Sequence, residues 1–161
     1  MEISELLLVG IEVSVALAGF AGIIATFQFR DKTRIKRGQV VGLSLIVHLS
    51  LVLALLCALP FLLSIFEVQD AVLWSVCSGL AALWTSYTQY TVHINMKGAA
   101  RRRSTRFFIN MLQGVFVLIV ISLILNVLDL VFHREPGPYI AGIIIGLGLV
   151  GIMFTRLLIP P

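Results

Sequence analysis

The chain alternates between long apolar segments and short polar ones. The apolar segments cover about residues 6–29, 40–66, 71–96, 107–132 and 139–159. At a helical rise of about 1.5 Å per residue, each segment is long enough to cross a hydrocarbon layer of about 30 Å. The pattern therefore predicts an all-α fold. It predicts a single transmembrane domain over residues 1–161, an integral membrane helical bundle with five transmembrane helices.

Basic residues mark one side of this predicted bundle. Eleven of the twelve Lys and Arg residues fall in the clusters Arg30–Arg37 and Lys97–Arg106 or at Arg156. Basic residues close to membrane crossings are retained on the cytoplasmic side. The pattern therefore predicts a multi-pass protein of the cell membrane with its N-terminus outside and its C-terminus in the cytoplasm. The cluster residues that carry this prediction are Arg30, Lys32, Arg34, Lys36, Arg37, Lys97, Arg101, Arg102, Arg103 and Arg106.

The composition is unlike that of a soluble domain. Charged residues make up 12% of the chain and apolar residues 59%, whereas soluble globular domains carry about 25% charged residues. The net charge of +4 comes from residues beside the predicted crossings. Insertion bias and anionic lipid headgroups account for such charges. We therefore expect the lipid bilayer, including anionic lipids, as a partner, and no nucleic acid.

Sequence motifs of catalysis or cofactor binding are missing. The chain has no H-E-x-x-H, G-x-S-x-G, G-x-x-x-x-G-K-[ST] or C-x-x-C pattern. Cys57 and Cys77 lie inside apolar segments, where free thiols are expected. A haem held by two histidines needs both at one depth, but His48 lies near the middle of its segment and His93 near the inner edge. We expect no enzyme activity, no cofactor and no metal site.

Small residues recur in the first and fifth segments. Gly10, Ser14, Ala18 and Gly22 follow one another every four residues, and Gly142 and Gly146 share this spacing. Helices in lipid associate through close packing at such small residues. Five helices offer few neighbours for all these surfaces. The pattern therefore predicts helix packing and a homo-oligomer, with docking of another membrane protein as the alternative use of the same surfaces.

Acidic and amide side chains lie inside the outer part of two segments. Glu12 is six residues inside the first segment, about 9 Å below its outer edge at the rise of an α-helix. Asn126 and Asp129 lie at comparable depths in the fourth segment. There the spacing of Ser122, Asn126, Asp129 and His133 predicts one polar helix face.

A second group of polar residues lies deeper. Folding the second and third segments as a hairpin places His48 opposite Gln89. Ionisable residues within a membrane are costly, at about 2.5 to 3.5 kcal/mol for a charge at the centre, and are functional candidates by default. The candidates for an ion or proton pathway are Glu12, His48, Gln89, Asn126 and Asp129.

Two interpretations of these residues are open. In the first, carboxyl groups bind and release a proton or hold a cation, and His48 relays the proton, because imidazole titrates near neutral pH. The protein is then a channel or transport component for protons or small cations. In the second, the same residues only form hydrogen bonds between helices, and the protein is an accessory subunit or membrane sensor that docks a partner protein.

Short motifs resemble those of a known group of proteins. They are Ala18-Gly-Phe-Ala-Gly-Ile, Asn126, the Pro138-Tyr139 turn and the ending Phe154-Thr-Arg-Leu-Leu. Together they resemble small uncharacterised multi-pass proteins of bacterial inner membranes. The resemblance covers most of the chain and implies a location in the bacterial inner membrane. It implies no activity.

Overall fold

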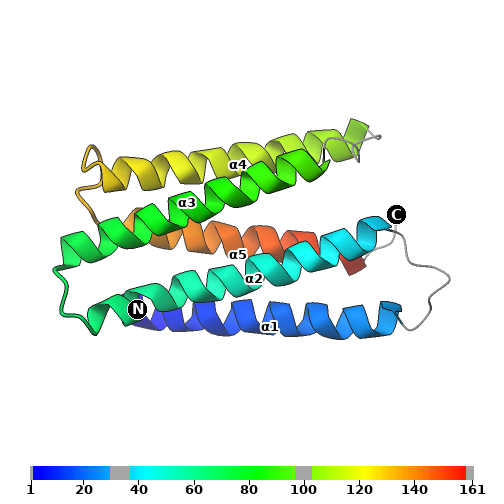
Figure 1. Ribbon diagram of the computed structural model, residues 1–161, viewed down its shortest axis with the longest axis horizontal. Coiled ribbons are helices and arrows are strands. Elements are labelled where there is room, and N and C mark those ends of the chain that lie inside the picture. The colour runs from blue at the N-terminus through cyan, green and yellow to red at the C-terminus, as the bar shows by residue number, and fades with distance from the viewer. Residues whose placement is uncertain (1, 30–36, 97–102, 159–161) are drawn as a thin grey trace. The chain divides into compact units, whose positions relative to one another are not determined.

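The computed structural model describes residues 2–29, 37–96 and 103–158, and these fold into five α-helices (Figure 1). The helices are α1 (Ile3–Phe29), α2 (Arg37–Ser64), α3 (Asp70–Met96), α4 (Arg103–Val127) and α5 (Gly137–Leu158). The prediction of an all-α chain is confirmed for this part of the protein. Two helices end before the predicted apolar segments do: α2 ends at Ser64, and α4 ends at Val127.

Three of the helices are long and apolar enough to cross a membrane. Within the described residues these stretches are Ile3–Phe27, Gly42–Ser64 and Gly137–Arg156. The apolar stretch of α4 is shorter, Met111–Val127. The more polar α3, which carries Ser75, Ser78 and Gln89, does not join this group. The chain is therefore a candidate membrane protein with three spanning helices, while five crossings and their orientation stay predictions.

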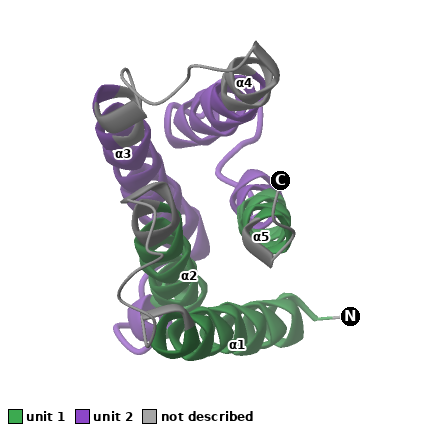
Figure 2. Ribbon diagram, turned by 90° about the vertical axis from the view of Figure 1, so that its right-hand side faces the viewer, with its two compact units in different colours: residues 1–61, 143–161 green, residues 62–142 purple. Residues whose placement is uncertain are grey.

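The chain separates into two compact units (Figure 2). Unit 1 comprises Met1–Phe61 and Ile143–Pro161, and unit 2 comprises Leu62–Gly142.

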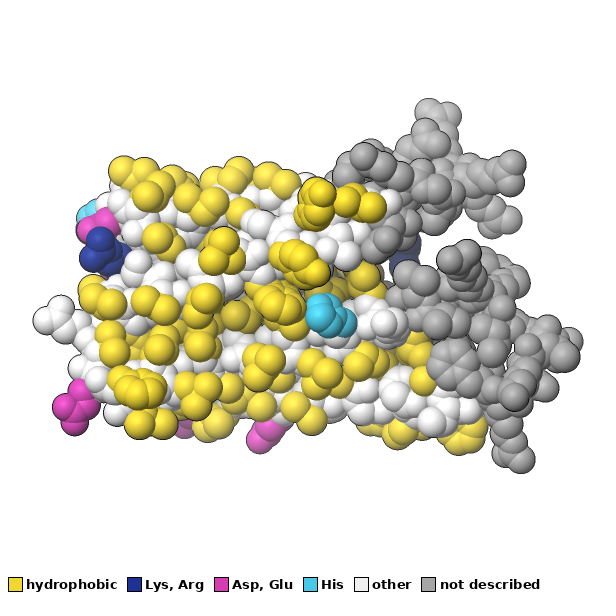
Figure 3. Space-filling model, viewed as in Figure 1, with side chains coloured by type: hydrophobic (Ala, Val, Ile, Leu, Met, Phe, Trp, Pro, Cys, Tyr) yellow, Lys and Arg dark blue, Asp and Glu magenta, His cyan; other side chains and the backbone are white. Residues whose placement is uncertain are grey.

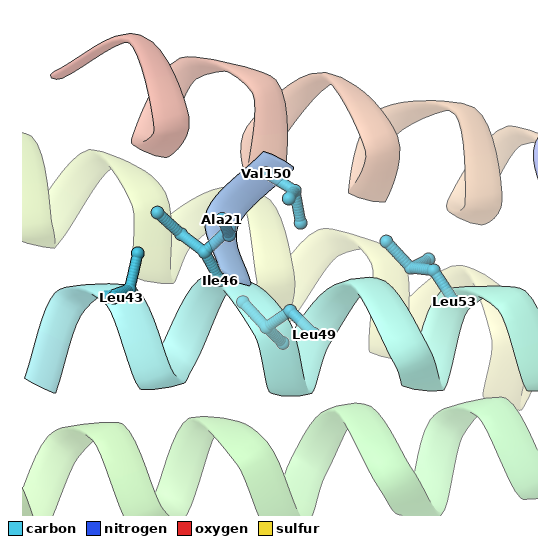
Figure 4. Close-up of a cluster of buried hydrophobic side chains, with 6 residues drawn as sticks. All are labelled: Ala21, Leu43, Ile46, Leu49, Leu53 and Val150. Atoms are coloured by element: carbon cyan, nitrogen blue, oxygen red, sulfur yellow. The ribbon is translucent and has the colours of Figure 1, made fainter. Parts of the chain in front are cut away.

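Unit 1 is held together by apolar contacts among α1, α2 and α5. Its core brings one small residue of α1 between larger side chains of the other two helices (Figure 4). The members of this core are Ala21, Leu43, Ile46, Leu49, Leu53 and Val150. Gly10 packs so closely on α2 that an added Cβ atom would lie 2.8 Å from the Sγ atom of Cys57. A Cβ atom at Gly146 would likewise lie 2.9 Å from Cδ2 of Leu53.

These contacts set the register of the antiparallel helices α1 and α2. Gly10 lies beside Cys57, and Ala21 lies beside Ile46 (Figure 4). Residue levels on the two helices can therefore be matched: a step toward the C-terminus on α1 corresponds to a step toward the N-terminus on α2. By this register, Gly19 shares a level with His48, and Ala16 with Leu51.

Unit 2 is built on the packing of α3 against α4. The buried side chains on these helices include Leu73, Cys77, Leu112 and Leu123. The start of α5 joins them through Tyr139, which is buried and whose ring lies 6.0 Å from that of Trp74 between centroids.

Much of the described surface on the face drawn in Figure 3 is apolar. Large apolar side chains that are at least two-thirds exposed occur on several helices: Phe27, Leu55, Leu83 and Leu118. Exposed apolar side chains of this size and number make a protein aggregate in water, whereas lipid tails accommodate them. The surface therefore agrees with a membrane environment.

Candidate functional site

Of the candidate residues for an ion or proton pathway, Glu12 has the fewest interactions with the rest of the described chain. Its side chain is exposed on α1, and the exposed residues near it on this helix, Leu8, Val9 and Val13, are apolar. It forms no hydrogen bond or ion pair within residues 2–29, 37–96 and 103–158. A carboxylate facing hydrocarbon without a partner is unfavourable by several kcal/mol. The carboxyl group therefore needs a proton, water or a partner from outside the described residues.

Glu12 belongs to a continuous exposed strip of α1, which we call the Glu12 face. Successive members lie three or four residues apart, and each is exposed in the structure. The members are Glu5, Leu8, Glu12, Ala16, Gly19, Ile23 and Thr26. Thr26 is satisfied locally, because its hydroxyl donates to the carbonyl of Ile23 at 2.7 Å. The one polar group of the middle of this face is therefore Glu12.

The geometry of an α-helix explains why this strip stays on one face. With 3.6 residues per turn, a step of seven residues falls only about 20° short of two full turns. Glu5, Glu12, Gly19 and Thr26 follow that step. A step of four residues instead overshoots one turn by about 40°. The stripe from Gly10 to Gly22 therefore rotates by about 120° around the helix.

The small residues of α1 that recur every four positions therefore have different surroundings. Gly10 contacts Cys57, Ser14 is fully buried, and Ala18 is half-buried. At Gly22 an added Cβ atom would meet nothing within 4 Å. Gly10 and Ser14 thus pack inside unit 1, and Gly22 does not. Their part in an oligomer stays a prediction.

The two small residues of α5 also contact side chains of their own chain. A Cβ atom at Gly142 would lie 3.4 Å from Cγ2 of Ile119 in unit 2. Gly146 faces Leu53 in unit 1. The four-residue spacing of these glycines therefore serves contacts within each unit.

His48 lies on α2 with an exposed side chain, and it interacts with another group of the chain. By the register of α1 and α2 it shares a level with Gly19, seven residues from Glu12. Seven residues of helix correspond to about 10 Å along the axis. Direct proton transfer between Glu12 and His48 is excluded at that separation, so a relay between them needs water.

Gln89 links the two helices of unit 2. Its Nε2 atom donates a hydrogen bond of 3.1 Å to the backbone carbonyl of Gln113 on α4. This is the contact expected of a residue that holds helices together in a membrane. The pairing of Gln89 with His48 stays a prediction.

Asn126 is fully buried at the end of α4 and joins three parts of unit 2. Its Nδ2 atom donates to Oγ of Ser78 on α3 at 2.9 Å and to the carbonyl of Glu135 at 3.0 Å. Its Oδ1 atom is buried and accepts no hydrogen bond in the described structure. This geometry fixes α3, α4 and the connection to α5, and it keeps the amide away from the surface.

Asp129 lies beyond the end of α4, so the predicted polar helix face is wrong for Asp129 and His133. The backbone of Asp129 is left-handed, with φ of 59°. Its N–H donates to the carbonyl of Asn126 at 3.3 Å, and the N–H of Leu130 donates to that of Leu125 at 3.2 Å. These two bonds form a Schellman motif, which ends a helix. Asp129 therefore terminates α4.

The side chain of Asp129 makes one loose ion pair. Its Oδ2 atom lies 4.0 Å from Nε of Arg134, and the two side chains are 50% and 41% exposed. Pairs with such exposure contribute about 0 to 1 kcal/mol. The pair leaves the carboxylate accessible from outside the protein but gives it little stabilisation.

Other candidate residues fall outside the described part of the chain. Among the basic residues these are Arg30, Lys32, Arg34, Lys36, Lys97, Arg101 and Arg102. Arg37 and Arg103 begin helices and Arg106 lies in the first turn of α4, but their side chains are not among those described. Over the described residues, no three His, Cys, Asp or Glu side chains gather as metal ligands would.

Comparisons with protein-family models, with curated proteins and with solved structures give no match for the chain. The case for a function therefore rests on the residues themselves.

Proposed function

We propose that this protein is an oligomeric component of a membrane, of the bacterial inner membrane by its sequence resemblance, and that it transports protons or small cations with Glu12 as the exchanging acid. One observation carries the proposal. The carboxyl group of Glu12 is exposed on an apolar helix face without a partner in the described chain. An ionisable group held in such a place at an energetic cost is a functional candidate.

The proposal assigns no transport role to Asn126 or Asp129. Asn126 donates both hydrogen bonds of its amide inside unit 2, and the backbone of Asp129 terminates α4. Both observations favour structural roles. His48 keeps the role of a relay only through water, because of its separation from Glu12 along the helices.

Proton flux into liposomes tests the proposal. Purified protein is reconstituted, a potential is imposed with a potassium gradient and ionophore, and an internal pH dye reports flux. We expect the wild type to acidify the lumen faster than empty liposomes do. Glu12→Gln should return the rate to that of empty liposomes, because an amide keeps the size of the carboxyl group but cannot exchange a proton.

Glu5→Gln is the matched control for this experiment. Glu5 lies one heptad before Glu12, on the same exposed face, and outside the apolar stretch predicted from the sequence. We expect its variant to conduct as the wild type does. Equal flux in the wild type and in Glu12→Gln would contradict the role of Glu12.

A second function is favoured by a different observation. Gly19 and Gly22 have open space where a Cβ atom would lie, which leaves room for another helix to approach α1. This geometry suits an accessory subunit or sensor that docks a partner protein. Wild-type liposomes that conduct neither protons nor small cations faster than empty ones would contradict transport and favour this second function.

A further inference from the structure

The Glu12 face differs from the small-residue surfaces that the sequence singles out. Gly10 and Ser14 pack inside unit 1, whereas Glu12, Ala16 and Gly19 are exposed. We propose that a second copy of this chain, inserted in the same direction, covers the Glu12 face. In this dimer α1 packs against α1 and the two Glu12 carboxyl groups form a hydrogen-bonded pair. The inference rests on the proposed function for the role of Glu12 and names its partner.

The chemistry of the Glu12 carboxyl group favours a second copy of this chain as the molecule that covers the Glu12 face. Two copies inserted in one direction place each residue at the same depth as its counterpart. A two-fold axis along the membrane normal then brings a strip of one helix against the same strip of the other. A pair of carboxyl groups that holds a proton is self-complementary, because one oxygen donates and another accepts. The pair thus satisfies both acids in hydrocarbon.

The basic residues of a second copy are badly placed to form an ion pair with the Glu12 carboxyl group. Eleven of the twelve lie in the two clusters or at Arg156, on the side that the sequence predicts as cytoplasmic. The remaining one, Arg134, lies beside Asp129 in unit 2. At the depth of Glu12, the complementary group that another copy offers is its own Glu12.

The shape of the face allows close approach next to Glu12. Ala16 follows it by one turn, and Gly19 by two turns. A Cβ atom at Gly19 would meet nothing within 4 Å. Helices in lipid associate where small residues let their backbones come together. The seven-residue step from Glu12 to Gly19 is also the repeat of left-handed helix pairs.

Disulfide cross-linking in vesicles of purified protein tests the dimer. Cys57 and Cys77 are first replaced by Ala, and a single cysteine is introduced by Ala16→Cys. The control is Leu51→Cys, since Leu51 is 49% exposed on α2 and shares the level of Ala16 in the register. On oxidation with copper phenanthroline, we expect dimers to form several-fold faster from Ala16→Cys. Equal rates at the two positions would show random collision and overturn the inference.

Substitutions at Glu12 test the dimer interface and proton transport independently. In the Ala16→Cys background, Glu12→Gln keeps a donor and an acceptor, so cross-linking should persist. Glu12→Leu removes both and should lower cross-linking to the rate of Leu51→Cys. Unchanged cross-linking in Glu12→Leu would overturn the carboxyl pair. Loss of proton flux in Glu12→Gln with intact cross-linking supports both proposals, whereas normal flux with intact cross-linking contradicts only the role of Glu12 as the exchanging acid.

Discussion

Asp129 has a backbone conformation that L-amino acids other than glycine adopt at a cost. Its φ of 59° places it in the left-handed region, which is unfavourable by about 1 to 2 kcal/mol for a residue with a Cβ atom. Asp129→Gly should therefore raise the free energy of unfolding by about 1 kcal/mol. The measurement is thermal unfolding in mild detergent, followed by circular dichroism.

The control for this prediction is Asp129→Asn. Asn tolerates the left-handed region as Asp does, and the variant removes only the carboxylate that lies 4.0 Å from Arg134. We expect its unfolding temperature to match that of the wild type. A lower stability in both variants would show that the ion pair, rather than the backbone, determines the role of Asp129.

Asn126 and Asp129 show what the sequence can indicate about single residues. Both are polar in an apolar segment, so both were candidates for a site. The end of α4 lacks a glycine or proline signal, because no Gly or Pro occurs between Val127 and Glu135 and the residues Leu130 to Phe132 are apolar. The apolar pattern of the fourth segment therefore continues through these residues, although the helix ends before them. The bond from Asn126 to the carbonyl of Glu135 depends on the path of the connection, which no spacing predicts.

At the scale of the helices, we predict opposite effects on stability for substitutions at Gly10 and at Gly22. A Cβ atom at Gly10 would lie 2.8 Å from Sγ of Cys57, whereas one at Gly22 would meet nothing within 4 Å. Gly10→Ala should destabilise the protein by about 1 to 3 kcal/mol through overpacking. Gly22→Ala should be neutral or stabilise it by up to about 1 kcal/mol through helix propensity. Unfolding temperatures in mild detergent compare the two variants.

A second substitution tests the cause of the Gly10 effect. Cys57→Ala removes the sulfur atom that a Cβ atom at position 10 would meet. The double variant with Gly10→Ala should be more stable than the sum of the single effects, since the two side chains share one space. Additive effects would indicate that the loss at Gly10 comes from another contact.

The sequence could predict which helices exist but not which sides they bury. Five apolar segments correspond to α1 to α5. The four-residue spacing of small residues in α1 predicts helix packing, but that spacing rotates around the helix, and of these residues only Gly10 and Ser14 are buried. The exposed strip through Glu12 and Gly19 follows the seven-residue step. Whether this strip is exposed depends on which side of α1 is covered by α2 and α5. That is determined by the packing of unit 1 and not by the sequence of α1 alone.

At the scale of the whole molecule, hydropathy leaves the number of crossings open. Polar residues lower the mean hydropathy of α3, but two of them are satisfied between α3 and α4. Ser78 accepts from Asn126, and Gln89 donates to the carbonyl of Gln113. A helix pair that bonds its polar groups internally can lie in lipid at lower cost than its composition indicates. This pairing favours five crossings.

Arrangements with three and with five crossings agree at both ends of the chain. In each, an outer N-terminus leads through α1 and α2 to an outer turn at Glu67, and α5 ends in the cytoplasm. They differ in the side of the membrane on which the basic cluster Lys97–Arg106 lies, which covers the connection between α3 and α4 and the first turn of α4. Five crossings place this cluster inside, as the retention of basic residues in the cytoplasm requires. Three crossings leave it outside with α3 and α4.

Cysteine labelling of intact bacterial spheroplasts separates the two arrangements. In the background without Cys57 and Cys77, Glu67→Cys should react at once with a membrane-impermeant maleimide. Lys97→Cys should react only after the membrane is permeabilised, because moving the four remaining basic residues of its cluster across the bilayer without a compensating acid is unfavourable. Equal labelling of both positions would place α3 and α4 outside the membrane. Protection of Glu67→Cys would instead reverse the orientation of the whole chain.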